Sequence, residues 1–490
     1  MKKVSSVFYI TVSLVAVFVI IGAILPNQFE QITSLINIFL STNFGWYYMW
    51  LFSAIILFSL IVAFSPYGKI KLGKKNDKPD FSTASWIAML FSAGLGIGLV
   101  FYGAAEPLYH FVTDTPAAAP GSDDAFKQSL SFTFFHWGIH GWSMYGFIAL
   151  ALAFFQFRKG EPGLISATLK PIFGEKMNGP FGTTIDVLAT FATVFGVATS
   201  LGFGASQING GLNHLFGIDV GFTAQFFIIL IVTVLFLISA WSGLSKGIKY
   251  LSNTNMVLAL LLLITIIIMG PTLLIFNMFT ESFGLYLQNI VQLSFRTAPL
   301  ESDNRDWLDA WTIFYWAWWI SWGPFVGMFI ARVSRGRTIR QFILGVIIAP
   351  TLIVCIWFAA FGTTAGNIQN SGVDLSQYVT ELVLFNMFDQ LPLSFLLSAI
   401  AILLIVSFFI TSADSATFVL GIQATKGSLS PPNSVKVVWG IAQSSIALIL
   451  LYVGGLTALQ NTIIAAALPF SYILILMMIS LFKALSKEKV

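Results

Sequence analysis

Twelve apolar runs of about twenty residues dominate this chain. The hydrocarbon core of a bilayer is about 30 Å thick, and a helix needs about 20 apolar residues to cross it. Lipid offers no hydrogen-bond partners, so the backbone of such a run must satisfy itself as a helix. The runs are residues 7–25, 47–65, 84–106, 128–157, 182–208, 219–241, 247–270, 308–332, 341–362, 392–421, 434–453 and 458–482. The sequence therefore predicts an all-α membrane protein with twelve transmembrane helices.

The composition agrees with a lipid-solvated surface. Only 9% of the 490 residues are charged and 57% are hydrophobic, whereas a soluble protein carries about 25% charged residues. The single cysteine, Cys355, lies in an apolar run, so no intramolecular disulfide can form and no metal cluster is indicated. No H-E-x-x-H motif and no nucleophile with a suitably spaced base is evident. We therefore expect neither enzymatic activity nor a bound cofactor.

Basic residues occupy alternate loops. If the N-terminus lies inside, 22 of the 25 Lys and Arg residues fall in inside segments, and only Lys127, Arg296 and Arg305 fall outside. Cytoplasmic loops of membrane proteins carry such an excess. The net charge of +4 is then explained by the basic loops on the cytoplasmic side of the membrane. We therefore expect membrane lipids, and not nucleic acid, as partners. The pattern predicts a multi-pass protein with both termini in the cytoplasm.

Two predicted spans contain residues that disfavour a continuous helix. The third span contains Gly94, Gly96 and Gly98, and the eighth contains Gly323 followed by Pro324. Such glycines can also serve close helix packing. The two spans, however, begin two sets of five helices, 3–7 and 8–12, and the odd number makes the second set inverted. Paired interruptions in inverted repeats indicate a transporter site near the bilayer midplane.

Aromatic residues form broad faces on the fourth and eighth spans. They are Trp137, Trp142 and Tyr145 on the fourth span and Trp316, Trp319 and Trp322 on the eighth. Interfacial aromatic belts lie at helix ends. Trp137 and Trp319 instead lie about ten residues inside their spans, which is near the middle of the bilayer at a rise of about 1.5 Å per residue. Aromatic faces that converge at this depth suit a cation without hydrogen-bond donors, such as a quaternary ammonium group.

The sequence resembles the betaine/choline/carnitine transporter family over residues 3–481. The resemblance is carried by GLGIG at 94–98, FYGAAEP at 101–107, FHWGIHGWSMY at 135–145, FVGMFIAR and RGRT within 316–340, and TSADSA at 411–416. It implies a leucine-transporter-like five-plus-five inverted repeat preceded by two extra helices. It also implies a homotrimer in the inner membrane of a prokaryotic cell.

This fold would divide the chain into five segments. They are two helices and a basic loop at 1–82, the first repeat at 83–270, an extracellular amphipathic connection at 271–307, the second repeat at 308–482 and a short basic tail at 483–490.

The resemblance also implies a substrate box of aromatic residues beside the interrupted third span. The candidate substrate-binding residues are Trp137, Trp142, Tyr145, Trp316, Trp319 and Trp322, the last on the access path, with Gly94, Gly96 and Gly98. Gly98 leaves the interrupted segment without a carboxylate. A zwitterion such as glycine betaine supplies its own negative charge, whereas choline would benefit from an acid here.

Adjacent hydroxyls at Thr411 and Ser412 could bind a hard monovalent cation, or they could bond back to their own helix. The resemblance implies a sodium site there. Its ligands would be the carbonyls of Ser92, Leu95 and Phe408 and the hydroxyls of Thr411 and Ser412.

A second sodium site of the family is matched only in part. Thr193 and Phe325 fit it, but Val197 stands where sodium-coupled members often carry threonine, and a methyl group cannot coordinate a cation. The ion stoichiometry therefore stays open.

Three polar residues in predicted spans allow more than one interpretation. Asp414 is expected to form structural hydrogen bonds, with a proton relay as the alternative. His136 and His140 are one turn apart, yet no third ligand is evident, so we expect hydrogen-bonded core residues. The predicted function is sodium symport of glycine betaine or a related trimethylammonium solute. The alternative is a sodium-independent transporter, proton-coupled or exchanging, of choline or carnitine.

Overall fold

The computed structural model describes residues 4–94, 96–242 and 245–488, without the side chains of 91–94, 242 and 245–249. The described residues form helices and one isolated bridge, between Lys71 and Thr338, but no strand. The all-α fold predicted from the sequence is thereby confirmed.

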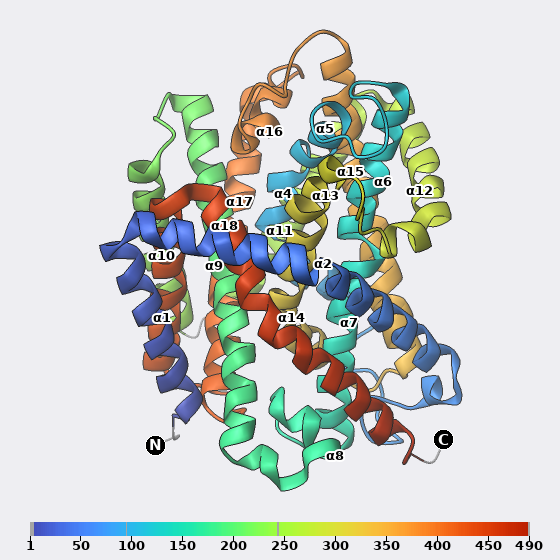
Figure 1. The fold of residues 1–490 in the computed structure, drawn as a ribbon, viewed down its shortest axis with the longest axis vertical. Coiled ribbons are helices and arrows are strands. Elements are labelled where there is room, and N and C mark those ends of the chain that lie inside the picture. Colours follow the sequence, from blue (N-terminus) through green and yellow to red (C-terminus); the bar gives the residue numbers. More distant parts are fainter. Residues whose placement is uncertain (1–3, 95, 243–244, 489–490) are drawn as a thin grey trace.

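The helices follow one another along the whole chain (Figure 1). The first are α1 (Ser6–Ile24), α2 (Pro26–Phe64), η1 (Pro66–Lys69), α3 (Thr83–Gly94), α4 (Ile97–Tyr102), α5 (Ala105–Val112), α6 (Asp123–Trp137) and α7 (Ile139–Ala153). Next come η2 (Phe154–Arg158), η3 (Ser166–Leu169), α8 (Lys170–Phe173), η4 (Gly174–Asn178), α9 (Pro180–Phe216), α10 (Phe222–Ser242), α11 (Ser245–Met269) and α12 (Thr272–Ser294). The last are α13 (Ser302–Trp307), η5 (Leu308–Ile313), α14 (Phe314–Val333), α15 (Ile339–Asn370), α16 (Thr380–Phe388), α17 (Ser394–Ala424) and α18 (Asn433–Leu485).

Ten helices within the described residues are long and apolar enough to cross a membrane. The prediction of twelve differs from this number at two places. The predicted third span is divided into the short helices α3 and α4. The predicted spans 434–453 and 458–482 lie in the single element α18, whose backbone is not helical at Gly454 and Gly455. The count of twelve therefore stays a prediction.

The eighth span contradicts the sequence prediction of an interruption at Gly323-Pro324. Helix α14 continues through both residues. The glycines serve close packing instead, because a Cβ at Gly323 would lie 2.3 Å from Ile148 Cδ1, and one at Gly327 would lie 2.7 Å from Ile148 Cγ2. The break appears in the fourth span, where Gly138 separates α6 from α7.

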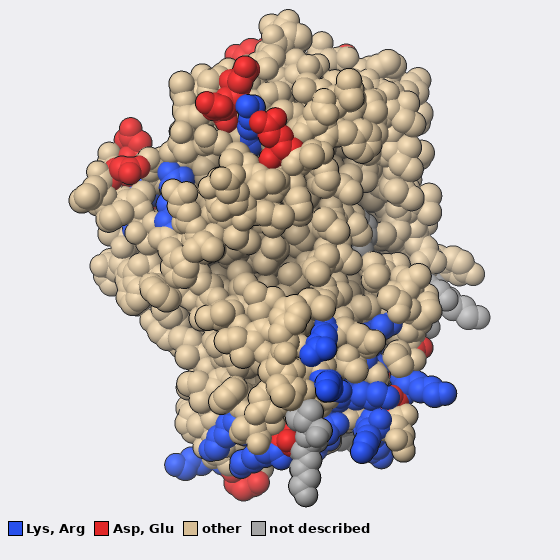
Figure 2. Space-filling model, turned by 90° about the vertical axis from the view of Figure 1, so that its right-hand side faces the viewer, with Lys and Arg blue, Asp and Glu red and all other residues tan. Residues whose placement is uncertain are grey.

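Both ends of the chain lie at the same end of the molecule (Figure 1). Lys and Arg side chains gather there, and a wide band without charged side chains separates them from acidic residues at the opposite end (Figure 2). We call the end with both termini the basic end. Chain ends on one side require an even number of crossings, and the bare band fits the apolar interior of a bilayer.

Helix α14 lies at the centre of the helix bundle (Figure 1). All of its residues except Phe329 and Arg332 are buried. Helices α7 and α9 pack against it, and α4 packs against α9. Large apolar side chains of α1, α10 and α11 are instead exposed, as expected for helices that face lipid. The interrupted segment, the fourth span and α14 thus meet in the protected interior.

Candidate functional site

A small cavity lies where the interrupted segment, the fourth span, α9 and α14 meet. Its lining residues are Gly96, Ile97, Gly98, Leu99, Trp137, Tyr145, Ser200, Trp318, Trp319 and Trp322. We call Trp137, Tyr145, Trp318, Trp319 and Trp322 the aromatic box. The cavity holds about 30 Å³, which is room for roughly one or two water molecules. A trimethylammonium group would require these rings to move apart.

Trp319 lies among the other rings of the box. Its ring centroid is 4.7 Å from that of Tyr145 and 6.0 Å from that of Trp137. Trp137 also meets Trp318 edge to face at 5.8 Å. These spacings are typical of packed aromatic pairs.

Hydrogen bonds hold the four indoles of the box by their N–H groups. Trp319 donates to the carbonyl of His136 at 2.9 Å, and Trp322 donates to the carbonyl of Gly196 at 2.8 Å. The remaining two indoles have side-chain acceptors: Trp318 donates to Ser200 Oγ at 3.2 Å and Trp137 to Glu106 Oε2 at 2.7 Å. Since every indole N–H of the box is engaged, the four indoles offer the cavity carbon surface rather than hydrogen-bond donors. Such a surface suits a cation that cannot form hydrogen bonds.

Two glycines allow the rings to approach the backbone. A Cβ at Gly98 would lie 2.3 Å from Trp318 Cη2 and 3.0 Å from Trp137 Cη2. A Cβ at Gly141 would lie 2.3 Å from Trp319 Cε2. Any other residue at these positions would displace a ring, so the glycines set the shape of the box.

The structure brings some predicted residues to the cavity and leaves others away from it. Trp137, Tyr145, Trp319, Trp322, Gly96 and Gly98 line it. Trp142 is fully buried behind the box, with its ring centroid 6.2 Å from that of Trp319. Trp316 does not reach the cavity, because it stacks on Phe52 at 4.4 Å. Gly94 belongs to α3 and is described only as helical backbone.

Sequence reasoning missed Trp318 and Ser200. Trp318 lies outside the helix face of positions 316, 319 and 322, which the sequence prediction uses. Steps of three residues drift by about 60° each at 100° per residue, whereas 318, 319 and 322 lie within about 100° of one another. The two faces differ by only about 20° in width, so the helical period alone does not choose between them. Ser200 had no comparable signal in the sequence.

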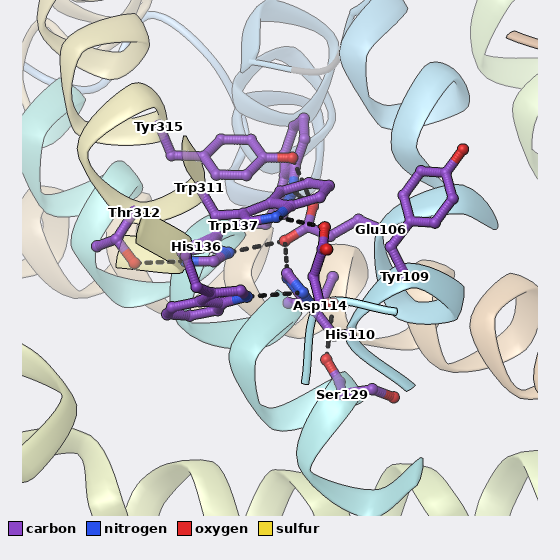
Figure 3. A network of polar contacts seen from close by, with 12 residues as sticks. Glu106, Tyr109, His110, Asp114, Ser129, His136, Trp137, Trp311, Thr312 and Tyr315 are labelled. Atoms are coloured by element: carbon purple, nitrogen blue, oxygen red, sulfur yellow. Dashed lines mark hydrogen bonds and ion pairs between the residues drawn. The ribbon is translucent and has the colours of Figure 1, made fainter. Parts of the chain in front are cut away.

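A buried carboxylate holds the outer edge of the box (Figure 3). Glu106 of α5 is fully buried and accepts hydrogen bonds from Trp137 Nε1 and, at 2.5 Å, from the hydroxyl of Tyr315. His136 Nδ1 lies 2.7 Å from Glu106 Oε1, and His136 Nε2 lies 2.9 Å from Thr312 Oγ1. The carboxylate thus joins α5, α6 and α14 at the end of the cavity away from the basic end, and His136 extends the network to η5.

Glu106, His110 and His136 are close enough together to hold a metal ion. The donors around them do not fit one. Trp307 Nε1 donates to His110 Nδ1 at 3.2 Å, so the neutral ring carries its proton on Nε2, the atom that faces Glu106. A protonated nitrogen cannot ligate a metal. The expectation of hydrogen-bonded core histidines is confirmed for His136, and also for His140, whose Nε2 lies 2.8 Å from Ser294 Oγ.

Larger cavities lie on both sides of the box. One of about 500 Å³ lies away from the basic end, lined by Tyr102, Trp311 and Glu381 among others. One of about 290 Å³ lies toward the basic end, lined by Phe325, Arg332 and Asp414 among others. Asp414 accepts a hydrogen bond from Ser239 at 2.6 Å. Its structural role and the proton relay both stay predictions.

Thr411, one of the candidate cation residues on α17, faces α11. Thr411 Oγ1 donates to the carbonyl of Ser407 at 2.9 Å, and the amide nitrogen of Asn255 donates to Thr411 Oγ1 at 3.1 Å. Asn255 is 2% exposed, and its Oδ1 has no hydrogen-bond partner among the described residues. Of the predicted carbonyl ligands, Phe408 is buried, Leu95 lies outside the described residues, and Ser92 is described only as helical backbone.

The residues predicted for a second cation site lie on α9 and α14. Thr193 is fully buried and donates to the carbonyl of Ala189 at 2.8 Å. Phe325 meets Trp322 edge to face at 5.5 Å, and Val197 is fully buried. The Thr193 hydroxyl thus bonds to its own helix.

Residues 6–490 match the model of the BCCT family, the betaine/carnitine/choline family transporters. This chain belongs to that family.

Two curated relatives span almost the whole chain. It is 56% identical to a glycine betaine transporter, OpuD, of Bacillus subtilis (strain 168), over 100% of this chain and 96% of the relative. It is 44% identical to an ectoine/hydroxyectoine transporter of Virgibacillus pantothenticus, over 98% of this chain and 96% of the relative. These relatives are transporters and not enzymes, in agreement with the sequence prediction.

A solved structure of a sodium-coupled sialic acid symporter aligns with 90% of this chain and 86% of its own. The TM-score is 0.49 and the identity 16%. We draw nothing from a likeness this distant, so the inverted repeat stays a prediction.

Proposed function

We propose that this chain imports glycine betaine, or a related trimethylammonium solute, by sodium symport with alternating access. The observation that carries the proposal is the aromatic box, whose indole N–H groups are engaged and whose rings line the cavity. Each ring contributes about 0.5–2 kcal/mol to binding a cation. The similarity to a glycine betaine transporter supports the same substrate.

The substrate contacts would come from the box itself. Trp137, Tyr145 and Trp319 would surround the methylated head, with Trp318 closing one wall and Trp322 on the path to the basic end. Trp142 would support Tyr145 and Trp319 from behind, since it meets both rings at about 6 Å. Trp316 would not touch the substrate in this arrangement, because its ring stacks on Phe52 and does not line the cavity.

Sodium is proposed as the co-transported ion, with no resident cofactor. Thr411 and Ser412 would supply hydroxyl oxygens, and Ser92, Leu95 and Phe408 carbonyl oxygens. The unpartnered, buried Oδ1 of Asn255 beside Thr411 supports an oxygen-rich cation site at this place. Sodium binding would order the end of α3 and raise substrate affinity, and by linkage substrate would raise sodium affinity equally.

Alternating access would open the box to one flanking cavity at a time. The outer cavity is separated from the box by Tyr102, whose ring centroid lies 6.3 Å from that of Trp137. The inner cavity is separated from it by the Trp322–Phe325 pair. Small rotations of these rings would connect the box to either side.

The proposal extends to the orientation, organisation and assembly of the protein in the membrane. The basic end would face the cytoplasm, because positive residues gather there (Figure 2). The chain would comprise two leading helices, two five-helix repeats, the connection at 271–307 and a short tail. It would work as a homotrimer in the cell membrane.

A sodium-independent transporter of choline or carnitine, proton-coupled or exchanging, is the second candidate. It is favoured by Val197, a buried methyl-bearing side chain at the second cation site.

Uptake into proteoliposomes distinguishes the two candidates. Labelled glycine betaine should accumulate with an inward sodium gradient and should fall to the background level when potassium replaces sodium. Uptake that is unchanged in potassium would refute sodium coupling. Competition by unlabelled betaine, choline, carnitine and proline on the same vesicles would rank the substrates, with betaine expected first.

A further inference from the structure

The environment of Glu106 indicates an ionised side chain. Trp137 and Tyr315 both donate to its Oε2, and an indole N–H can only donate. The other oxygen, Oε1, faces the protonated Nε2 of His110, whose Nδ1 accepts from Trp307. Both oxygens therefore face donors, and an ionised carboxylate, which is an acceptor only, matches them. Among the described residues, its ion-pair contacts are with His110 at 3.4 Å and His136 at 2.7 Å, and with no Lys or Arg.

Among the described residues, this buried charge has only histidines, and no Lys or Arg, beside it. His110 is neutral, since its Nδ1 accepts from Trp307. Burying a carboxylate is costly unless hydrogen bonds or a counter-charge compensate. Hydrogen bonds supply part of that compensation here. A cationic substrate head in the adjacent cavity would supply more.

The indole of Trp137 connects the carboxylate to the cavity. Its ring lines the cavity, while its N–H donates to Glu106 Oε2 at 2.7 Å (Figure 3). A hydrogen bond to an ionised acceptor is stronger than a neutral one and polarises its donor. Electron density shifted into the ring makes its face more negative, and the attraction of a cation to an aromatic face is electrostatic.

We propose that Glu106 determines specificity for a cationic head group, by delivering its negative charge to the cavity through the indole of Trp137. The inference rests on the proposed function, since it needs a substrate with a quaternary ammonium head. It gives the box a preference for charge, which its shape alone would not provide. A neutral head of equal size would gain nothing from Glu106.

A pair of ligands separates charge from shape. Glycine betaine and its tert-butyl analogue, in which carbon replaces the quaternary nitrogen, have nearly the same size and the same carboxylate. Their dissociation constants would be measured by the quenching of tryptophan fluorescence on purified protein. Competition against labelled betaine uptake would give a second measure. The wild-type protein should bind betaine more tightly than the analogue.

Glu106→Gln removes the charge and keeps the shape. The glutamine carbonyl can still accept from Trp137 or Tyr315, and its amide can face His136 Nδ1 once the ring proton moves to Nε2. We expect betaine affinity to fall about tenfold, within the usual strength of cation–π contacts. The affinity for the tert-butyl analogue should stay the same, so the ratio of the two constants falls. Equal losses for both ligands, or no loss, would overturn the proposal.

Trp137→Phe provides a second route that keeps the Glu106 side chain but removes the hydrogen bond between Glu106 and the indole. Phenylalanine keeps a ring at the cavity but lacks the N–H. The betaine-to-analogue ratio should fall as it does in Glu106→Gln, and adding Glu106→Gln to Trp137→Phe should lower it little further. Fully additive losses would show that the indole does not transmit the charge, and would overturn the proposal.

Asp186→Asn is the matched control. Asp186 is a buried carboxylate of α9 near the basic end, held by the N–H and hydroxyl of Ser166. Its loss should leave the ratio at the wild-type value. A wild-type protein without preference for betaine would refute the proposed function itself, whereas a wild-type preference that Glu106→Gln preserves would refute only the role of Glu106.

Discussion

At the scale of single residues, ring orientation decides what the site can recognise. The box rings each expose 4–8% of their surface, while Trp142 and Trp316 expose none. This small exposure therefore distinguishes the box rings from Trp142 and Trp316. The acceptor of each indole N–H in the box then fixes whether a ring turns its face or its polar edge to the cavity.

Gly98→Ala should weaken substrate binding about tenfold, since a one-atom intrusion into a packed aromatic site costs about 1–3 kcal/mol. The added Cβ would lie 2.3 Å from Trp318 Cη2 and force that ring into the cavity. Gly284→Ala in α12 is the control, because a Cβ there has no neighbour within 4 Å. Dissociation constants for betaine check this, and equal affinities in both variants would contradict it.

The sequence predicts most of the box residues but not the carboxylate behind them. Trp137 and Trp319 are recognisable because they are aromatic residues deep in apolar runs. The contact between Glu106 and Trp137 joins positions on different helices, and no local pattern reports such a contact. Ser200 is missed for the same reason.

At the scale of helices, glycine has two different effects that the sequence does not separate. At Gly138 the helix is interrupted, and a Cβ there would lie 2.4 Å from the carbonyl oxygen of Phe134. At Gly323 the helix continues, and the missing side chain makes room for Ile148. The difference depends on the neighbouring helix. Fold class and most helix positions therefore follow from the apolar pattern, whereas the positions of the breaks do not.

The contact between α11 and α17 gives a prediction for ion coupling. Thr411→Val removes a hydroxyl oxygen while keeping the shape of the side chain. We expect the sodium concentration for half-maximal uptake to rise at least about fivefold, as the loss of a hydrogen-bonding group costs about 1 kcal/mol or more. Sodium-induced fluorescence changes in the absence of substrate should shift by the same factor.

Thr417→Val is the matched control on the same helix, since Thr417 is buried and bonds to the carbonyl of Asp414. If both variants keep the wild-type sodium dependence, Thr411 does not belong to a cation site.

At the scale of the whole molecule, most basic side chains lie at the end that also holds both chain termini (Figures 1 and 2). Glu488, beyond α18, pairs with Arg158 and with Lys159 at the end of the fourth span. The pattern of basic loops groups Arg158 and Lys159 with the other basic residues, but it cannot pair them with Glu488, because the partners are more than 300 positions apart.

The contact of Glu488 should depend on pH. Partial burial disfavours its charge, but the hydrogen bonds and charges of Arg158 and Lys159 prevail and hold the pKa of Glu488 below its usual value of 4.5. A lowered carboxylate pKa means that the contact is fully formed above pH 4.5 and is lost as the pH falls through the lowered value. The protection of residues 483–488 from hydrogen exchange, taken relative to the intrinsic rate at each pH, should therefore fall on acidification. Glu488→Gln should show low protection at every pH, and unchanged protection in that variant would contradict the contact.

The central claim is that aromatic faces in the middle of the membrane hold a methylated ammonium head. The most direct measurement is the affinity for glycine betaine of Trp319→Leu, with Trp319→Phe as the variant that keeps a ring. The account predicts a loss of at least about tenfold in Trp319→Leu and a smaller loss in Trp319→Phe. Wild-type affinity and uptake in a folded Trp319→Leu protein would contradict it.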